Sequence, residues 1–226
     1  MKNLIIFDFD DTIVDNSKLD YLGFKIPSKK LDINFPTRTK LNKFRKNGMI
    51  AKEIFQEFTN DEKILNQLLQ SRKNFLEKTS IDYLEIKPYS NLVFQKLLNA
   101  GNELMIATAN NDPKMVDKFL IEKNIHQYFK NIFSKNTLNI HLESNNYSNR
   151  LLIKTSLLRM IIKNYKNSFD NFIFIANSLE DYYAAKKHKI KFIYFLNSYL
   201  PNPKINNLKK ITKMNQIIDL ILVEKK

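Results

Sequence analysis

Three runs of consecutive apolar residues, each ending abruptly at a polar residue, are the clearest pattern in this chain. The runs, with the residues that end them, are 4–7 with Asp8, 104–107 with Thr108, and 172–176 with Asn177. A short run that is apolar at every position is typical of a strand buried on both faces, as in a parallel sheet. Two weaker runs, 132–133 and 191–195, predict further strands of the same sheet.

Helical spacing of apolar residues fills the segments between these strands. One helix is predicted to end at Gly101, and another to begin at Pro113 with Asp112 as its N-cap. Residues 151–165 and 181–187 have the same helical spacing. Strands that alternate with helices indicate an α/β fold with a doubly wound, parallel, Rossmann-like sheet. Ligands bind at the carboxyl ends of such strands, so the polar residues that end the three long runs are expected to converge.

One long segment interrupts the alternation of strands and helices. Between residues 16 and 87 no core strand is evident, whereas residues 50–58 and 64–75 have helical spacing. We therefore predict two domains. A core that contains the sheet is formed by residues 1–15 and 88–226, and a helical domain of residues 16–87 is inserted after the first strand, with Pro88 at the return to the core.

The composition narrows the classes of protein and of partner. The chain has 226 residues, 43% of them hydrophobic, without a cysteine or a long uncharged apolar run, which argues against a membrane span, a disulfide framework and a thiolate nucleophile. We expect a cytoplasmic protein. The net charge is +14, but the excess of Lys over Arg and the frequent Asn and Ile are typical of an AT-rich genome, and the lysines are scattered along the chain. We therefore expect no nucleic-acid partner, although a basic surface attracts phosphorylated substrates.

Four segments, in this order along the chain, together resemble the four signature motifs of the haloacid dehalogenase-like (HAD) hydrolases. They are Asp8-Phe9-Asp10-Asp11-Thr12 after the first strand, Thr108 after a second strand, Lys154 at the head of a predicted helix, and Ala176-Asn177-Ser178-Leu179-Glu180-Asp181. Each motif alone is a weak signal, but four motifs in register over nearly the whole chain are a specific one. The resemblance implies a Rossmann-like core, and residues 16–87 resemble the helical cap of this family.

The resemblance also implies a reaction and a set of site residues. Family members with an aspartate at the position of Asp10 generally transfer phosphoryl groups. Asp8 would be the nucleophile that forms an aspartyl-phosphate, and Asp10 the general acid and base. The expected ligands of the phosphoryl group are Thr108, Ala109, Asn110 and Lys154, and the expected Mg²⁺ ligands are Asp8, Asp10, Asn177 and Asp181. We therefore expect a Mg²⁺-dependent phosphatase that acts on a small phosphorylated metabolite.

The fourth segment departs from the family pattern. The motif normally begins Gly-Asp, but here it reads Ala176-Asn177, so that an amide replaces the metal-binding carboxylate. An amide oxygen can still bind Mg²⁺, but one negative charge is lost and the affinity should fall. Two alternatives therefore stay open beside the phosphatase. They are a phosphosugar mutase of the same family, and a degenerate member that binds a phosphorylated ligand with little turnover.

Several other polar residues are further candidates for the site or for the surface. Lys135 competes with Lys154 for the role of the motif lysine. Arg38, Lys40, Lys43 and Arg45 are candidates for substrate contacts from the helical insertion. His126, His141 and His188 have no partner pattern and are predicted to lie on the surface. The Asn-rich segment 143–149 is predicted to be a loop, and no pattern indicates an oligomeric state.

Overall fold

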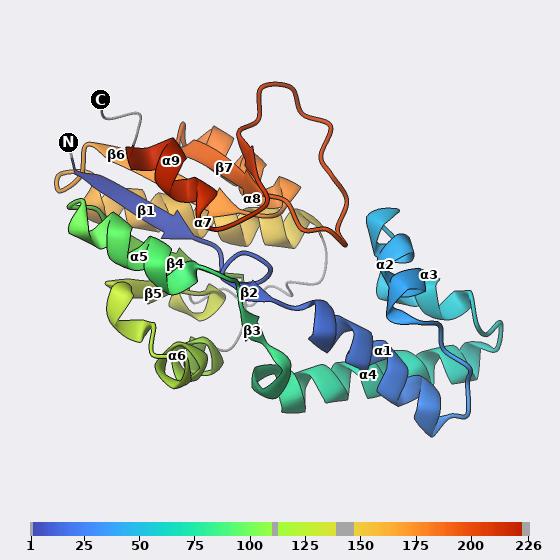
Figure 1. The fold of residues 1–226 in the computed structure, drawn as a ribbon. Helices are drawn as coiled ribbons and strands as arrows, with labels where there is room; N and C mark the ends of the chain where they lie inside the picture. The colour runs from blue at the N-terminus through green and yellow to red at the C-terminus, as the bar shows by residue number, and fades with distance from the viewer. Residues whose placement is uncertain (1, 110–112, 139–146, 223–226) are drawn as a thin grey trace. The chain divides into compact units, whose positions relative to one another are not determined.

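The chain folds into two compact units in a computed structural model that describes residues 2–109, 113–138 and 147–222 (Figure 1). The first unit consists of Met1–Val14, Ile86–Leu196 and Ile205–Lys226, and the second of Asp15–Glu85 and Asn197–Lys204. Two strands of two residues each, β2 (Val14–Asp15) and β3 (Glu85–Ile86), pair where the chain passes between the units. The second unit therefore contains the helical insertion together with a short segment from the C-terminal part of the chain.

The first unit is built around a six-stranded parallel sheet in the order β5-β4-β1-β6-β7-β8. The strands are β1 (Asn3–Phe7), β4 (Glu103–Ala107), β5 (Asn131–Phe133), β6 (Asn171–Ala176), β7 (Lys191–Phe195) and β8 (Lys210–Ile211). The five strands expected from the sequence are confirmed. The sixth, β8, has only two residues, which is too short to leave a periodic pattern. The central strand β1 lies between β4 and β6, so the residue after it stands at the middle of the sheet.

Helices cover both faces of this sheet (Figure 1). They are α5 (Ser90–Asn99), α6 (Pro113–Glu122), α7 (Tyr147–Tyr165), α8 (Leu179–Lys187) and α9 (Gln216–Leu222), with two 3₁₀ turns, η1 (His126–Tyr128) and η2 (Lys135–Leu138). Leu4 and Ile6 of β1 belong to the core that α7 and α8 complete, whereas the Phe7 ring packs edge-on against Phe94 of α5, 5.3 Å between centroids. Strand alternation therefore directs Asp8 toward the face covered by α7.

The helix signals in the sequence are confirmed at two boundaries and corrected at a third. Helix α5 ends before Gly101, whose φ of +78° is the left-handed conformation that glycine adopts without strain. Helix α6 begins at Pro113, while its expected N-cap, Asp112, lies outside the described residues. Helix α7 begins at Tyr147, so Lys154 lies two turns inside it and not at its head. The first turn of α7 is polar and therefore added nothing to the apolar periodicity.

The second unit is helical and has its own core. It contains α1 (Ser17–Lys30), α2 (Arg38–Lys46), α3 (Ala51–Gln56) and α4 (Glu62–Tyr83). The buried side chains at its centre are Phe24, Leu41, Ile54, Phe55, Leu65 and Leu68. Asp61 caps α4 by accepting hydrogen bonds from the amides of Lys63 (2.8 Å) and Ile64 (3.1 Å), which are free donors of the first helical turn. A segment with its own apolar core and helix caps has the features of a separate domain.

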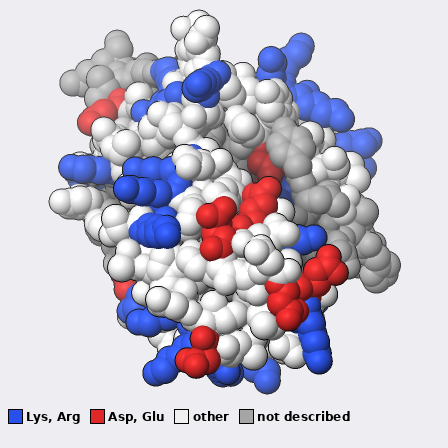
Figure 2. Space-filling model, turned by 90° about the vertical axis from the view of Figure 1, so that its right-hand side faces the viewer, with Lys and Arg blue, Asp and Glu red and all other residues white. Residues whose placement is uncertain are grey.

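Charged side chains are dispersed over the face of the molecule that Figure 2 shows. On the face in Figure 2, lysines and arginines lie in separate groups with acidic side chains among them, and no continuous basic band crosses it. A chain with a net charge of +14 can therefore carry that charge without concentrating it in one patch on this face. None of the helices in the described part of the chain is long and apolar enough to cross a membrane.

Candidate active site

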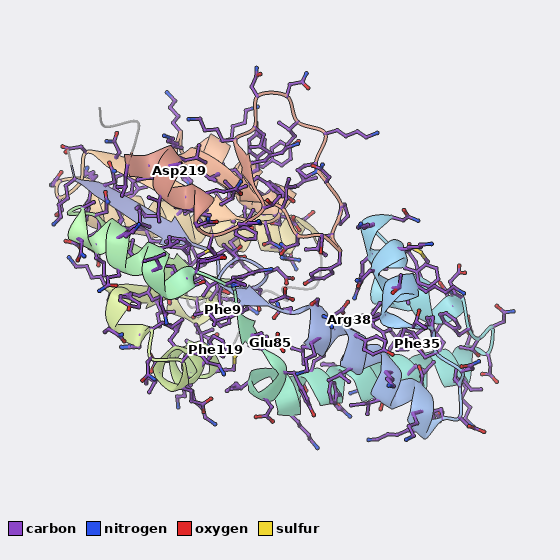
Figure 3. All side chains as sticks on the ribbon, viewed as in Figure 1. Phe9, Phe35, Arg38, Glu85, Phe119 and Asp219 are labelled. Atoms are coloured by element: carbon purple, nitrogen blue, oxygen red, sulfur yellow. The ribbon has the colours of Figure 1, made fainter. Side chains whose placement is uncertain are left out.

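A tight turn directly after β1 presents the first two acidic residues of the motif. The amides of residues 12–14 all donate to the carbonyl oxygen of Phe9, at 3.0 to 3.3 Å, which bends the chain sharply. Asp11 has a φ of +58°, a conformation that aspartate tolerates better than most residues. The buried Phe9 ring anchors the turn by packing edge-on against Phe119 of α6, with ring centroids 5.6 Å apart (Figure 3). The turn therefore places Asp8 and Asp10 at the carboxyl end of the sheet.

Lys154 of α7 lies beside Asp8 in the interior. Its Nζ donates to Asp8 Oδ1 at 2.5 Å and to the carbonyl oxygen of Ala107 at 3.0 Å, and it lies 2.9 Å from Asp181 Oδ1. Lys154 and Asp8 are only 2% and 4% exposed, and Asp181 is fully buried. One ammonium group therefore joins the ends of β1 and β4 to the start of α8. The four motifs in register predicted that Lys154 and Asp8 would lie close together.

Asp181 is fixed by a second partner at the start of α8. Ser178, the N-cap of this helix, donates its hydroxyl to Asp181 Oδ2 at 2.6 Å and accepts from the Asp181 amide at 3.2 Å. Both carboxylate oxygens of Asp181 are thus engaged, one by Ser178 and the other by Lys154. This arrangement suits a residue that holds Lys154 in place, a role different from that of the metal ligand expected from the sequence.

The cluster holds more negative than positive charge. Burial raises the pKa of Asp8, the Lys154 ammonium lowers it, and the charges of Asp181 and Asp10 raise it again, leaving it at about 7. Burial alone would lower the pKa of Lys154, but the carboxylates of Asp181 and Asp8 outweigh burial and raise it. Lys154 is therefore a permanent cation, while a fully ionised Asp8 calls for further positive charge nearby.

Asn177 closes the site on the side of Asp8 that faces away from Lys154. One end of its side-chain amide lies 3.2 Å from Asp8 Oδ2 and 3.2 Å from the main-chain carbonyl oxygen of Asp10. The Thr12 hydroxyl lies 3.5 Å from the same end of the amide. The predicted metal ligands Asp8, Asp10 and Asn177 are thus brought together.

The same three groups offer carboxylate, carbonyl and amide oxygens, which are the hard ligands that Mg²⁺ prefers. Ligands at about 2.1 Å in octahedral geometry lie roughly 3 Å from one another, which is close to the spacing found here. The donor set therefore fits the metal. Among the described residues, no group of three or more His, Cys, Asp or Glu side chains could hold a metal ion. The set at Asp8 is not such a group, since two of its three ligands are an amide and a main-chain carbonyl.

The predicted phosphate ligands lie after β4. Thr108 is fully buried, and its amide donates to the carbonyl oxygen of Phe133 at 2.9 Å, which continues the sheet one residue beyond the strand. Ala109 follows it and packs against the core beneath α7. Asn110 lies outside the described residues. The structure thus places Thr108 at the same edge of the sheet as Asp8, since β4 and β1 are adjacent and parallel.

Arg150 is a cation near the site that the sequence reading missed. It stands one turn before Lys154 on α7, and its Nε lies 3.8 Å from Glu180 Oε1. Burial would lower its pKa, but the charges of Glu180, Asp181, Asp8 and Asp10 raise it above the usual value. Its side chain is 43% exposed, so its charge is accessible to a ligand. Arg150 and Lys154 are four residues apart, a spacing that puts both on one face of a helix. This spacing is the feature of the sequence from which Arg150 could have been predicted to lie near the site.

The competing candidates have other surroundings. Lys135 lies half-buried in η2. His126 is exposed and lies 3.0 Å from Asp117 Oδ1, as expected of a surface histidine. His188 is half-buried instead, and its Nε2 is 2.9 Å from the carbonyl oxygen of Thr155, which links the end of α8 to α7. His141 and most of the Asn-rich segment lie outside the described residues.

The basic residues suggested for substrate contacts in the second unit are partly engaged there. Arg45 donates from Nε and Nη2 to the two carboxylate oxygens of Asp20, at 2.8 and 2.7 Å, and Arg72 donates to the same carboxylate at 2.7 Å. Arg38, labelled in Figure 3, donates to the Ser17 hydroxyl at 2.6 Å. Lys40 lies over two aromatic rings, and Lys43 is exposed. Arg45 therefore stabilises this unit.

Comparisons with known proteins agree with this architecture. The sequence profile of the haloacid dehalogenase-like hydrolases matches residues 5–195. No curated protein matches the chain. Its fold is similar to that of a predicted phosphatase from Clostridium acetobutylicum, at 18% identity over 98% of both chains with a TM-score of 0.68.

Two further solved structures share the fold. One is a HAD-superfamily hydrolase of subfamily IA from Geobacter sulfurreducens PCA, at 12% identity over 97% of this chain and 96% of that one, with a TM-score of 0.70. The other is a predicted phosphoglycolate phosphatase from Haemophilus somnus 129pt, at 15% identity over 96% of each chain, with a TM-score of 0.66. The profile match spans most of the chain and includes all four motifs, so this protein belongs to the haloacid dehalogenase-like hydrolases.

Proposed function

We propose that this protein is a Mg²⁺-dependent phosphatase that hydrolyses a small phosphomonoester through a phosphorylated Asp8. The observation that carries the proposal is the buried contact between Asp8 and Lys154, with a second carboxylate, Asp10, two residues further along the chain. Membership of the HAD-like hydrolases supports it, as does the description of two proteins with the same fold as predicted phosphatases.

The reaction needs a nucleophile and, close to it, a group that donates and accepts a proton. An Asp8 carboxylate oxygen forms a bond to phosphorus, the ester bond breaks, and the leaving alkoxide takes a proton from Asp10. Asp10, now ionised, removes a proton from water, which attacks the phosphorylated Asp8 and releases inorganic phosphate and the free Asp8 carboxylate. Asp10 regains its proton in this step, so both residues return to their starting states.

The remaining residues of the cluster orient the nucleophile and stabilise charge. Lys154 holds Asp8 Oδ1 and supplies a fixed positive charge, which matters most when negative charge builds up on the transferred group. Asp181 and Ser178 position Lys154. Thr108, Ala109 and Asn110 are proposed to bind the phosphoryl oxygens. Lys154 thus contacts three groups, namely Asp8, Asp181 and the carbonyl oxygen of Ala107. A solvated ion pair on the surface would not be held in this way.

The metal would be held by Asp8 Oδ2, the Asp10 carbonyl oxygen and the Asn177 amide oxygen, since the Asn177 amide lies 3.2 Å from each of the other two. When bound, Mg²⁺ supplies positive charge that offsets the repulsion between the nucleophile and a phosphate ester. With the ion bound, Asp8 would have two cations close to its carboxylate, the metal and Lys154.

Arg150 is proposed to contribute to substrate binding. The Arg150 guanidinium is exposed and carries its charge next to the acidic cluster, so it suits a phosphate oxygen or a second anionic group of the substrate. Residues 16–87 are proposed to be the cap domain of this family. A small, phosphorylated and soluble metabolite is the class of partner that this site would accept.

A second candidate function is supported by Asn177, which lowers the negative charge available to a cation. A member of the family with weak metal binding would retain phosphorylated ligands with little turnover. The measured rate separates the two candidates, because binding without release of phosphate supports the second one.

The experiment is a screen for phosphate release from a broad panel of small phosphomonoesters, with and without Mg²⁺. We expect metal-dependent release from at least one compound, lost in the Asp8→Asn variant. Product analysis identifies any isomerised sugar phosphate, which would indicate a mutase. Release that is equal in wild type and Asp8→Asn for every active compound would contradict the proposal.

A further inference from the structure

The side chain of Asn177 meets two acceptors at one of its ends. Asp8 Oδ2 and the Asp10 carbonyl oxygen both lie 3.2 Å from the same amide atom. The end of the amide that suits two acceptors is the nitrogen, because it carries two hydrogens and can donate one to each. The Thr12 hydroxyl, 3.5 Å away, both donates and accepts, so it tolerates either end of the amide.

A carboxylate could not make these contacts. An aspartate at position 177 would place a third negatively charged or acceptor-only group against Asp8 Oδ2 and the Asp10 carbonyl. Repulsion between like charges at such separations is large in a buried site. In the absence of a cation, asparagine therefore fits this position better than the aspartate that the family pattern has here.

With a cation in place, the preference for one end of the amide reverses. A metal ion between Asp8 Oδ2 and the Asp10 carbonyl requires an oxygen from residue 177, since an amide nitrogen does not bind Mg²⁺. The two amide ends exchange by rotation about one side-chain bond, and no covalent bond changes. The same side chain can thus hydrogen-bond in the cation-free site and bind through its oxygen in the loaded one.

We propose that Asn177 is a positioning residue with two states. In the cation-free protein its amide nitrogen bridges Asp8 and Asp10, and on cation binding it turns its oxygen toward the same point. The inference deepens the proposed function and rests on it only for the identity of the cation. Its consequence is that the cation-free site is internally hydrogen-bonded, and that a cation has to displace two hydrogen bonds in order to bind.

The test compares wild type with Asn177→Asp and a matched control, Asn66→Asp, which adds the same charge on the exposed side of α4. Thermal unfolding in a chelator at about pH 8, where carboxylates are ionised, reports the cation-free state. We expect Asn177→Asp to unfold at least about 3 °C below wild type, whereas Asn66→Asp should stay close to wild type.

Calorimetric titration with Mg²⁺ alone measures the loaded state. We expect Asn177→Asp to bind Mg²⁺ about tenfold or more tightly than wild type, because a charge is added and two hydrogen bonds no longer compete. The Mg²⁺-induced rise in the unfolding temperature should be correspondingly larger in the variant than in wild type.

The side-chain amide gives a direct readout that a merely structural asparagine would not produce. In ¹⁵N-labelled protein, the NH₂ signal that disappears in Asn177→Asp should shift strongly when Mg²⁺ is added. An unshifted signal in protein that binds Mg²⁺, a cation-free Asn177→Asp as stable as wild type, or no Mg²⁺ binding by either protein would each overturn the inference. Absence of phosphate release with these results intact would instead contradict the proposed function alone.

Discussion

Two clusters of charged side chains, one buried in the sheet unit and one partly buried in the helical unit, have opposite balances of charge. In the helical unit, the carboxylate of Asp20 forms ion pairs with the guanidinium groups of Arg45 and Arg72. In the sheet unit, one ammonium, Lys154, stands between the carboxylates of Asp8 and Asp181, with Asp10 close by. The first cluster has a surplus of positive charge and the second a surplus of negative charge.

The two clusters also differ in what surrounds them. The guanidinium groups of Arg45 and Arg72 both lie over the Phe24 ring, at 5.1 and 4.7 Å from its centroid. The cation–π interaction with this ring therefore also stabilises the positive charge that Asp20 does not neutralise. Burial would raise the pKa of Asp20, but the two arginines outweigh it and lower the pKa. The charge of the Asp20 carboxylate is therefore balanced by the protein alone, as in a structural ion pair.

The sheet cluster is not balanced in this way. The pKa of Asp8 is raised to about 7 despite its contact with Lys154. A carboxyl group at that value changes its charge near neutral pH, as catalytic groups often do. The sign of the surplus charge therefore distinguishes the structural cluster of the helical unit from the sheet cluster, which under the proposed function would bind a cation and a phosphate ester.

The largest expected effect comes from removing the cation of the sheet cluster. Lys154→Met leaves Asp8 and Asp181 buried without their shared partner, so we expect a loss of about 3–5 kcal/mol in the free energy of unfolding. Phosphate release should fall by at least about 10²-fold, because a fixed charge is lost from the transition state. Denaturant unfolding and steady-state kinetics measure the two effects.

The control for this variant is Lys135→Met, which removes a lysine from the half-buried position in η2. It should keep wild-type activity within a factor of a few. Equal losses in the two variants would contradict the assignment of Lys154 and restore Lys135 as a candidate.

The next effect breaks the helical cluster. Asp20→Asn leaves two arginines near one neutral amide, and we expect about 3 kcal/mol of destabilisation. Asp82→Asn, on the exposed face of α4, is the matched control and should change stability by less than about 0.5 kcal/mol. Urea unfolding followed by circular dichroism measures both. A neutral effect of Asp20→Asn would show that packing on Phe24, and not charge, holds this cluster.

The pH dependence of stability should have opposite signs in the two clusters. The depressed pKa of Asp20 gives stability that is present above about pH 4, the value for an unfolded aspartate, and is lost as the pH falls further. The raised pKa of Asp8 gives stability that is complete below about pH 4 and is lost as the pH rises through about 7. We expect the second change to reach about 4 kcal/mol in metal-free protein.

Unfolding in a chelator at a series of pH values tests both signs. The difference in stability between wild type and Asp8→Asn should change between about pH 4 and 7, and that between wild type and Asp20→Asn should change below about pH 4. A flat profile for the Asp8 difference would contradict the surplus of negative charge in the sheet cluster.

The smallest effect concerns the support of Asp181. Ser178→Ala removes the N-cap of α8 and the hydroxyl that holds Asp181 Oδ2, so we expect about 1 kcal/mol of destabilisation. The rate of phosphate release should fall less than in Lys154→Met. Ser168→Ala, at an exposed position, serves as the control. A fall in rate as large as that of Lys154→Met would mean that Ser178 acts directly on the substrate.

The core sheet could be predicted from the sequence because buried parallel strands consist of consecutive apolar residues. Each long run ended at a residue of the site, so the convergence of Asp8, Thr108 and Asn177 followed from topology alone. The neighbours of β1 in the sheet, by contrast, depend on pairings between distant segments. The two-residue strands β2, β3 and β8 are too short for any periodicity.

The contacts of polar side chains were harder to predict than the fold. Nothing in the sequence spacing indicates that Asp181 holds Lys154, or that Arg45 is committed to Asp20, because these contacts join residues 27 and 25 positions apart. The exact start of α7 was missed because its first turn is polar. Arg150 could have been found from its spacing to Lys154, if both had been placed on one helix face.

The central claim is that Asp8 becomes phosphorylated during turnover. The most direct measurement is to mix the protein with an active phosphomonoester and Mg²⁺, quench in acid, digest with trypsin and locate the phosphoryl group by mass spectrometry. We predict one phosphoryl group on the peptide of residues 3–18, at Asp8, and none in the Asp8→Asn variant. A phosphoryl group on another residue, or full turnover by Asp8→Asn, would contradict the account.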